Sequence, residues 1–194
     1  MPRTEGEGPT VPGGWHPTLH TERLLLRSLA LTDLDALSAL HAEPSFWWYP
    51  DKRGRTAAET ESFLRRTVAH YDDPGFAVSA VVVRRTGELA GWAGLAIPTF
   101  LPQVLPAVEV GWRLGEDFRG HGYATEAGGA WLRHAFEDRH LDEVLSICEP
   151  ENAASGAVMR RLGFDLVEET THPTKDVALR VMRLTRDRWS AGAS

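Results

Sequence analysis

The chain has 194 residues, of which 42% are hydrophobic and 25% are charged, and its formal net charge is −6. This composition is typical of one globular domain with a sizeable core, and it excludes collagen-like, repeat and largely disordered chains. The negative charge argues against a broad nucleic-acid-binding surface, because such surfaces need an excess of Lys and Arg. The single cysteine, Cys148, excludes an internal disulfide, and no spacing of Cys and His predicts a metal site.

The ends of the chain and its hydropathy predict where the folded part lies. Residues 1–18, rich in Gly and Pro, are expected to form a flexible leader, residues 19–189 one folded domain and residues 190–194 a tail. The sequence contains no apolar stretch of about 18 residues and no signal-peptide pattern at its start. We therefore expect a cytoplasmic protein with no membrane partner.

The first part of the chain predicts one strand followed by two helices. A strand is expected at residues 24–27, where leucines follow one another. Thr32, with an acid three residues later, is expected to cap a helix that ends by Pro44. Thr56 and Glu59 form a clearer capping box at the start of the second helix.

After residue 75 the hydrophobic pattern becomes β-like. Two Val-rich or Ala-rich runs, at residues 76–84 and 88–97, are separated by Thr86-Gly87 and predict a hairpin. The remaining expected elements are a strand at 107–114, a helix at 123–139, a strand at 142–148, a helix at 152–162 and strands at 164–169 and 177–184. Without an internal repeat or a dividing linker, the order of elements predicts a single α/β domain.

The segment from Arg119 to Ala124 lies between a predicted strand and a predicted helix. A strand that turns into a helix through glycine points several backbone N–H groups at one spot, and the helix dipole adds positive charge there. Gly120 and Gly122 allow a ligand close to the backbone, and Arg119 either stiffens the loop or contacts a phosphate. The pattern predicts a phosphate or pyrophosphate site, with an ordinary tight turn as the alternative. It is no Walker loop and fits a dinucleotide fingerprint poorly, since the third glycine would fall at Thr125.

The surrounding motifs resemble the GNAT superfamily of N-acetyltransferases. The pattern Arg-x-x-Gly-x-Ala at 119–124 is preceded by EVGWRL at 109–114 and followed by Asn152-x-x-Ser155 and RLGF at 161–164. The run RGHGYATEA and the opening TERLLLR are similar, more narrowly, to the Rim branch, whose members acetylate the N-terminal amine of ribosomal proteins. The resemblance covers residues 21–184. It implies an α/β (α+β) GNAT fold, with a mixed, mostly antiparallel sheet flanked by helices, and makes residues 19–189 an N-acetyltransferase domain.

The resemblance implies acetyl-CoA as the cosubstrate and no metal. The CoA diphosphate would bind the backbone amides of residues 121–125, and the pantetheine arm would run beside residues 112–114 like an added strand. Asn152 would hold the pantetheine arm. The residues expected to contact the cofactor are Trp112, Arg113, Leu114, Arg119, Gly120, His121, Gly122, Tyr123, Ala124, Thr125 and Asn152.

Glu109 and Ser155 are the expected catalytic residues. Acetylation of an amine requires loss of a proton, stabilisation of the oxyanion and departure of the thiolate. Glu109 is our candidate for accepting the proton, directly or through water, although it could instead face solvent or pair with Arg113. Ser155 would hydrogen-bond or protonate the leaving sulfur, unless it bonds locally to backbone. Asn152 could also be the N-cap of its own helix.

The aromatic residues Trp47, Trp48 and Tyr49 are expected to line the acceptor pocket, because the first two helices flank the substrate cleft in this superfamily. The alternative is that they belong to the core, and Tyr49 is also an alternative acid. Cys148 is expected to be a small buried residue rather than an acyl-carrying nucleophile.

We therefore predict an N-acetyltransferase that transfers acetyl to a primary amine by direct attack in a ternary complex. The acceptor would be a protein N-terminus or a small amine such as a polyamine, an amino acid or an aminoglycoside-like drug, and a homodimer is compatible with the sequence. A non-catalytic acyl-CoA-binding regulatory module is the alternative, and a plain α/β domain with structural glycines is a third hypothesis. Only the enzyme would both bind CoA and acetylate an amine.

Overall fold

The computed structural model describes residues 17–47, 52–71 and 76–192 of the chain. Its strands are β1 Leu19–His20, β2 Leu24–Ser28, β3 Val78–Val83, β4 Leu89–Ala96, β5 Glu109–Leu114, β6 Glu143–Cys148, β7 Asp165–Thr171 and β8 Ala178–Thr185. Its α-helices are α1 Leu34–Ala42, α2 Ala57–Ala69, α3 Tyr123–Arg133, α4 Ala153–Arg161 and α5 Arg186–Gly192. Shorter helical turns occupy Leu31–Asp33, Pro102–Val104, Glu116–Phe118 and His134–Asp138.

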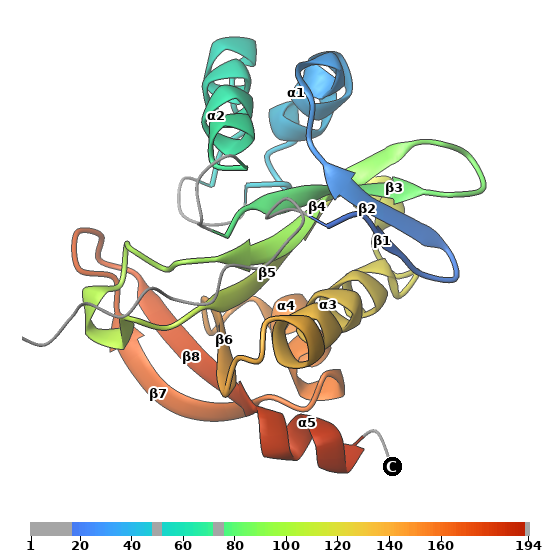
Figure 1. The fold of residues 1–194 in the computed structure, drawn as a ribbon. Helices are drawn as coiled ribbons and strands as arrows, with labels where there is room; N and C mark the ends of the chain where they lie inside the picture. Colours follow the sequence, from blue (N-terminus) through green and yellow to red (C-terminus); the bar gives the residue numbers. More distant parts are fainter. Residues whose placement is uncertain (1–16, 48–51, 72–75, 193–194) are drawn as a thin grey trace, which may run out of the picture.

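The strands form one eight-stranded sheet in the order β1-β2-β3-β4-β5-β6-β8-β7. Neighbouring strands run antiparallel, except that β5 and β6 are parallel. Helices α1 and α2 lie on one face of the sheet and α3 and α4 on the other (Figure 1). The predicted fold, a mixed and mostly antiparallel sheet flanked by helices, is confirmed.

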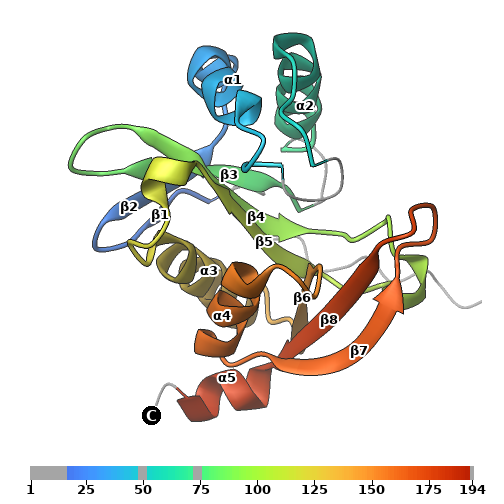
Figure 2. The same ribbon diagram turned by 180° about the vertical axis from the view of Figure 1, so that it is seen from behind.

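The main core lies between the sheet and α3. Ala127 and Trp131 of this helix, and Phe136 of the turn that follows it, are buried against the strands. A Cβ at Gly128 would lie 2.9 Å from Leu162 Cδ1 and 3.3 Å from the ring of Trp112. This close packing explains a helical glycine that lowers helix propensity. Figure 2 shows α4 beside α3 on this face.

A second core lies under α1 and α2, and the capping box that opens α2 is confirmed: Thr56 Oγ1 accepts a hydrogen bond from the N–H of Glu59 at 3.3 Å. The expected cap at Thr32 is wrong. A 3₁₀ turn precedes α1, and the Asp33 carboxylate accepts from the Ala30 N–H at 2.9 Å and pairs with Arg27 at 2.7 Å. The strand β2, rather than a capping hydroxyl, therefore fixes the start of this helix.

Two further differences concern helices. The segment predicted as one helix at 123–139 is α3 followed by a π-helical turn at His134–Asp138. Helix α5 was not predicted, and it includes residues 190–192 of the expected tail. Its Trp189 lies 5.8 Å, ring to ring, from Phe136. In the described ranges, no helix is both long and apolar enough to cross a membrane.

Candidate functional site

The parallel strands β5 and β6 part soon after they meet. Their ladder in the described residues has one register pair, Glu109 opposite Leu145. The Leu145 N–H donates to the Val108 carbonyl at 2.8 Å, and the Ser146 hydroxyl donates to the Val110 carbonyl at 2.9 Å. Because this hydroxyl replaces the next backbone donor, the ladder stops there and the strands diverge.

The divergence leaves the β6-facing edge of β5 open at Trp112. Backbone groups alternate in direction along a strand, so the N–H and carbonyl of Trp112 point the same way as the Val110 carbonyl, toward β6. The opposite edge of β5 remains paired with β4 from Glu109 to Leu114. The open edge therefore offers one donor and one acceptor to an extended ligand lying in the β5–β6 split.

The turn before α3 has the geometry that its glycines predict. Gly120 and Gly122 have φ angles of 78° and 80°, and Gly122 is the N-cap of α3 without a side-chain cap. The first helical hydrogen bond runs from Glu126 N to Gly122 O at 3.0 Å. The N–H groups of residues 123–125 are thus left for a ligand, in the positive end of the helix dipole. A Cβ at Gly120 would meet nothing within 4 Å, so this side of the turn is open.

The start of the folded chain anchors this turn. The Glu126 carboxylate accepts from the Thr21 hydroxyl at 2.5 Å and from the Arg23 N–H at 2.8 Å, and it pairs with the Arg23 guanidinium at 2.6 Å. Arg23 also donates to the His121 carbonyl at 2.8 Å. Burial opposes ionisation of Glu126, but the bonds from Thr21 and Arg23 outweigh it and lower the pKa of Glu126. This anchor was not predicted, although its residues lie in the runs TERLLLR and RGHGYATEA.

The side chains of Arg119 and Arg113 make structural contacts. Arg119 donates to the Leu114 carbonyl at 3.0 Å and to the Ser45 carbonyl at 2.9 Å, which supports the alternative that it stiffens the loop. Arg113 donates to the Phe46 carbonyl at 2.9 Å, on the α1 face of the sheet. Its backbone N–H and carbonyl point toward β4, opposite to those of Trp112, so the expected contact of Arg113 with the cofactor finds no support in this geometry.

Glu109 stands at the point where the split begins. Burial raises the pKa of the half-buried Glu109 to about 7, although the positive charge of Arg113 lowers it in part. Within the described part of the chain, no hydrogen bond or ion pair involves the Glu109 carboxylate. The two alternatives for Glu109 were a side chain that faces solvent and an ion pair with Arg113. The partial burial of Glu109 argues against the first, and the absence of an ion pair among the described residues argues against the second. A carboxylate with a pKa near neutrality is suited to accept a proton at physiological pH.

Asn152 and Ser155 lie at the start of α4, on the far side of the split from β5. Asn152 Oδ1 accepts from the Ser155 N–H at 3.0 Å, so Asn152 is the N-cap of α4. Its side-chain NH₂ takes no part in this bond. The Ser155 hydroxyl is half-buried and makes no hydrogen bond to the residues described, so the local backbone bond that we considered is not formed.

Of the aromatic residues expected at the acceptor pocket, Trp48 and Tyr49 lie outside the described residues. Trp47 is 3% exposed, and the guanidinium carbons of Arg55 and Arg113 lie 3.3 Å and 4.6 Å from the centroid of its ring. This burial supports the core alternative for Trp47. Burial also raises the pKa of the Cys148 thiol, which disfavours the thiolate needed for a nucleophile.

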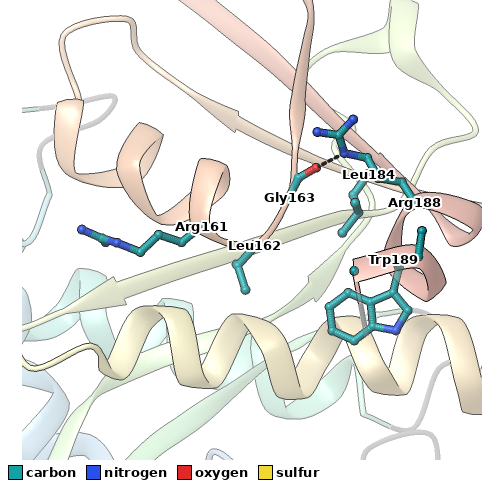
Figure 3. Close-up of a pocket in the computed structure, with 8 residues that line it drawn as sticks. Arg161, Leu162, Gly163, Leu184, Arg188 and Trp189 are labelled. Carbon is teal, nitrogen blue, oxygen red and sulfur yellow. Dashed lines mark hydrogen bonds between the residues drawn. The ribbon is translucent and has the colours of Figure 1, made fainter. Parts of the chain in front are cut away.

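A separate cavity of about 500 Å³ lies between the end of α4, β8 and α5 (Figure 3). Leu162, Leu184 and Trp189 form apolar walls, and the Arg188 side chain donates to the Gly163 carbonyl at 2.7 Å across its edge. None of its lining residues belongs to the expected cofactor or catalytic set, so this cavity is distinct from the split.

Comparisons with known proteins identify the family. The family model described as acetyltransferase (GNAT) domain matches residues 23–165. The FsC-acetyl coenzyme A-N(2)-transacetylase of Aspergillus fumigatus is 32% identical over 89% of this chain and 78% of its own length. An acetyltransferase structure from Agrobacterium tumefaciens is 30% identical, with a TM-score of 0.71 over 94% of this chain and 99% of its own.

The RimL ribosomal L7/L12 alpha-N-protein acetyltransferase, solved in complex with coenzyme A, is 18% identical and shares the fold. Its TM-score is 0.71 over 85% of this chain and 95% of that chain. The resemblance to the GNAT family seen in the motifs is confirmed. The chain belongs to the GNAT family of acetyltransferases.

Proposed function

We propose that this protein transfers the acetyl group of acetyl-CoA to a primary amine by direct attack in a ternary complex. The observation that carries the proposal is the split between β5 and β6. One end of the split begins at Glu109, whose pKa is raised to about 7, and the other leads to the uncapped N-terminus of α3. A proton acceptor and an anion-binding helix end are thus connected by one open strand edge.

The described residues fit CoA at three places. Two positive-φ glycines and the free N–H groups at the start of α3 suit a diphosphate, which accepts hydrogen bonds and carries negative charge. The open edge at Trp112 suits the amide groups of pantetheine. The side-chain NH₂ of Asn152, left free by capping, would donate to the same arm from the other side. When bound, acetyl-CoA supplies the acetyl group as an activated thioester.

Glu109 would accept the proton of the attacking amine, directly or through water. A primary ammonium ion cannot attack a carbonyl group until it loses a proton, and a base with a pKa near the working pH removes it most effectively. Ser155 would donate its hydroxyl hydrogen bond toward the leaving sulfur, because no local partner uses that hydroxyl. Holding the amine and the thioester together in one cleft supplies much of the remaining rate enhancement.

The acceptor is a primary amine of a small molecule or of a protein N-terminus. The Aspergillus fumigatus relative is named an FsC-acetyl coenzyme A-N(2)-transacetylase, and the structural neighbour a ribosomal L7/L12 alpha-N-protein acetyltransferase, so the names of related proteins differ in the acceptor. The net charge of −6 favours acceptors that carry positive charge.

The first experiment measures unfolding with and without acetyl-CoA for the wild type, Gly122→Trp and Gly87→Trp. Gly87 is the matched control, because its φ is 75° and its turn lies in the β3–β4 hairpin, outside the cofactor set. Acetyl-CoA at 100 times its dissociation constant should add about 2.7 kcal/mol to the wild type and to Gly87→Trp. Gly122→Trp should gain nothing. A wild type that saturating acetyl-CoA leaves unchanged would refute the proposed cofactor site.

Release of the CoA thiol against small amines, polyamines and peptides with a free N-terminus then tests catalysis. The proposal expects release with at least one of these classes and a strong loss in Glu109→Gln. Binding of acetyl-CoA without transfer to any amine would instead support the non-catalytic acyl-CoA-binding module.

A further inference from the structure

Glu149 is a buried acid just beyond the C-terminal end of β6. Its side chain is 4% exposed, and its Oε1 has no hydrogen-bond partner among the residues described. Its Oε2 lies 3.3 Å from the Nζ of Lys52. Burial of a carboxylate oxygen without a donor is unfavourable, so such a group commonly serves a ligand.

Glu149 lies on the same side of the sheet as Glu109. Leu145 is directly opposite Glu109, and directly opposed residues of a parallel pair share a face, which alternation carries to Ile147 near the end of β6. Glu149 follows the last residue of β6, and its partner Lys52 comes from the connection between α1 and α2, the helices on the face that Glu109 shares with Arg113. The two acids therefore stand on opposite walls of the split. Glu149 lies about 13 Å further along than Leu145, from a strand rise of about 3.3 Å per residue.

The group that pairs with Glu149 is itself a primary ammonium. Lys52 comes from the connection between α1 and α2, and its side chain is 52% exposed. Lys52 reaches solvent and holds only one of the two carboxylate oxygens, so another ammonium can take its place while the buried carboxylate keeps a cation beside it. The cation Arg180 is also near Glu149 in the fold, but its hydrogen bonds go to the Glu169 carboxylate at 2.8 Å and to the Pro150 carbonyl. Lys52 is therefore the cation that pairs with Glu149.

We propose that Glu149 is a specificity-determining residue that binds a second cationic group of the acceptor, and that Lys52 occupies this position in the free protein. The inference rests on the proposed function. The reacting amine must be neutral when it attacks, so it offers no charge to a carboxylate. A carboxylate on the far wall of the split therefore favours small acceptors that keep a second, protonated amine: diamines and polyamines.

The test uses straight-chain diamines from diaminobutane to diaminodecane, with amino groups at both ends, and the corresponding monoamines. Thiol release gives kcat/KM for each pair. Titration calorimetry in the presence of CoA gives binding affinity, whether or not the amine is acetylated. We expect the wild type to prefer the best diamine over its monoamine by about tenfold or more, since hydrogen bonds to charged groups are the stronger ones.

Glu149→Gln should bring the ratio of diamine to monoamine affinity close to one. Glu169→Gln removes the same charge from an exposed ion pair and should keep the wild-type ratio. Lys52→Met should strengthen diamine binding several-fold, because it removes the competing ammonium. If Glu149→Gln does not fold, diamine binding by Lys52→Met still tests the role of Glu149.

Three results would overturn the inference: a wild type without preference for any diamine, a Glu149→Gln variant that retains the preference, or a Lys52→Met variant that is only less stable and binds diamines no better. The stabilisation by acetyl-CoA and thiol release with monoamines test the proposed function separately. Loss of the diamine preference with those two intact would therefore refute only the role of Glu149.

Discussion

Replacing Glu109 by Gln should make the protein more stable at alkaline pH and much less active. Burial raises the pKa of Glu109 from 4.5 to about 7. Each pKa unit corresponds to about 1.4 kcal/mol, so the folded protein disfavours the ionised carboxylate by about 3 kcal/mol. The folded state binds this proton more tightly than the unfolded state does. Stability is therefore full below pH 4.5 and decreases as the pH rises toward 7.

Glutamine has the shape of the protonated acid and does not titrate. Glu109→Gln should exceed the wild type in unfolding free energy by about 3 kcal/mol at pH 8 and by less than about 1 kcal/mol at pH 5. The same variant should lose about 100-fold or more in kcat/KM at pH 8, the usual contribution of a general base. The wild-type rate should rise through an inflection near pH 7, and the variant should retain only the rise that comes from the amine itself.

Urea unfolding at the two pH values, together with thiol-release rates from pH 5 to 9, provides the measurements. Glu168→Gln removes the same charge from the exposed strand β7 and is the matched control. A stability difference between wild type and Glu109→Gln that does not change with pH would show that Glu109 ionises normally. Equal rates for the two proteins at pH 8 would show that Glu109 is not the general base.

Three further predictions concern the packing and hydrogen bonds that support the site. Gly128→Ala should be less stable than Gly129→Ala by about 1–3 kcal/mol in urea unfolding, because a Cβ at 128 meets Leu162 at 2.9 Å and one at 129 meets it at 3.7 Å. Tyr71→Phe should lower the unfolding free energy by about 1–3 kcal/mol, since the hydroxyl serves two part-buried backbone groups. Glu126→Gln should raise KM for acetyl-CoA severalfold without a matching fall in kcat, because it loosens the turn before α3.

Features encoded in short segments could be predicted from the sequence. The glycines at 120 and 122 need a positive φ, and the alternation in β5 separates the face of Trp112 from that of Glu109. The capping box at Thr56 uses groups within one turn of helix. In each case the determining contacts lie within a few residues, and the local pattern predicts them correctly.

Features that depend on contacts between distant segments could not be predicted. Thr32 has the right chemistry for a cap, but the Arg27–Asp33 pair and the 3₁₀ turn fix the helix start instead. The bond between Arg23 and Glu126 joins residues 103 positions apart. Nothing in the sequence around Glu149 indicates its burial, which only the fold shows. Helix α5 was missed because seven residues with little apolar content give a weak periodic signal.

Four departures from the rules of stable folding lie at the split. The β5–β6 ladder stops after one pair, α3 begins without a side-chain cap, Glu109 has a raised pKa, and Glu149 has a buried oxygen without a donor. Each departure lowers stability, and elsewhere in the described chain the cores under both helix layers are closely packed. A sequence selected only for stability would close the ladder and neutralise the acids. These features lie together at one open split of the sheet. Such an arrangement is expected at a binding site, because a bound ligand and its reacting amine supply the interactions that the folded chain itself does not make.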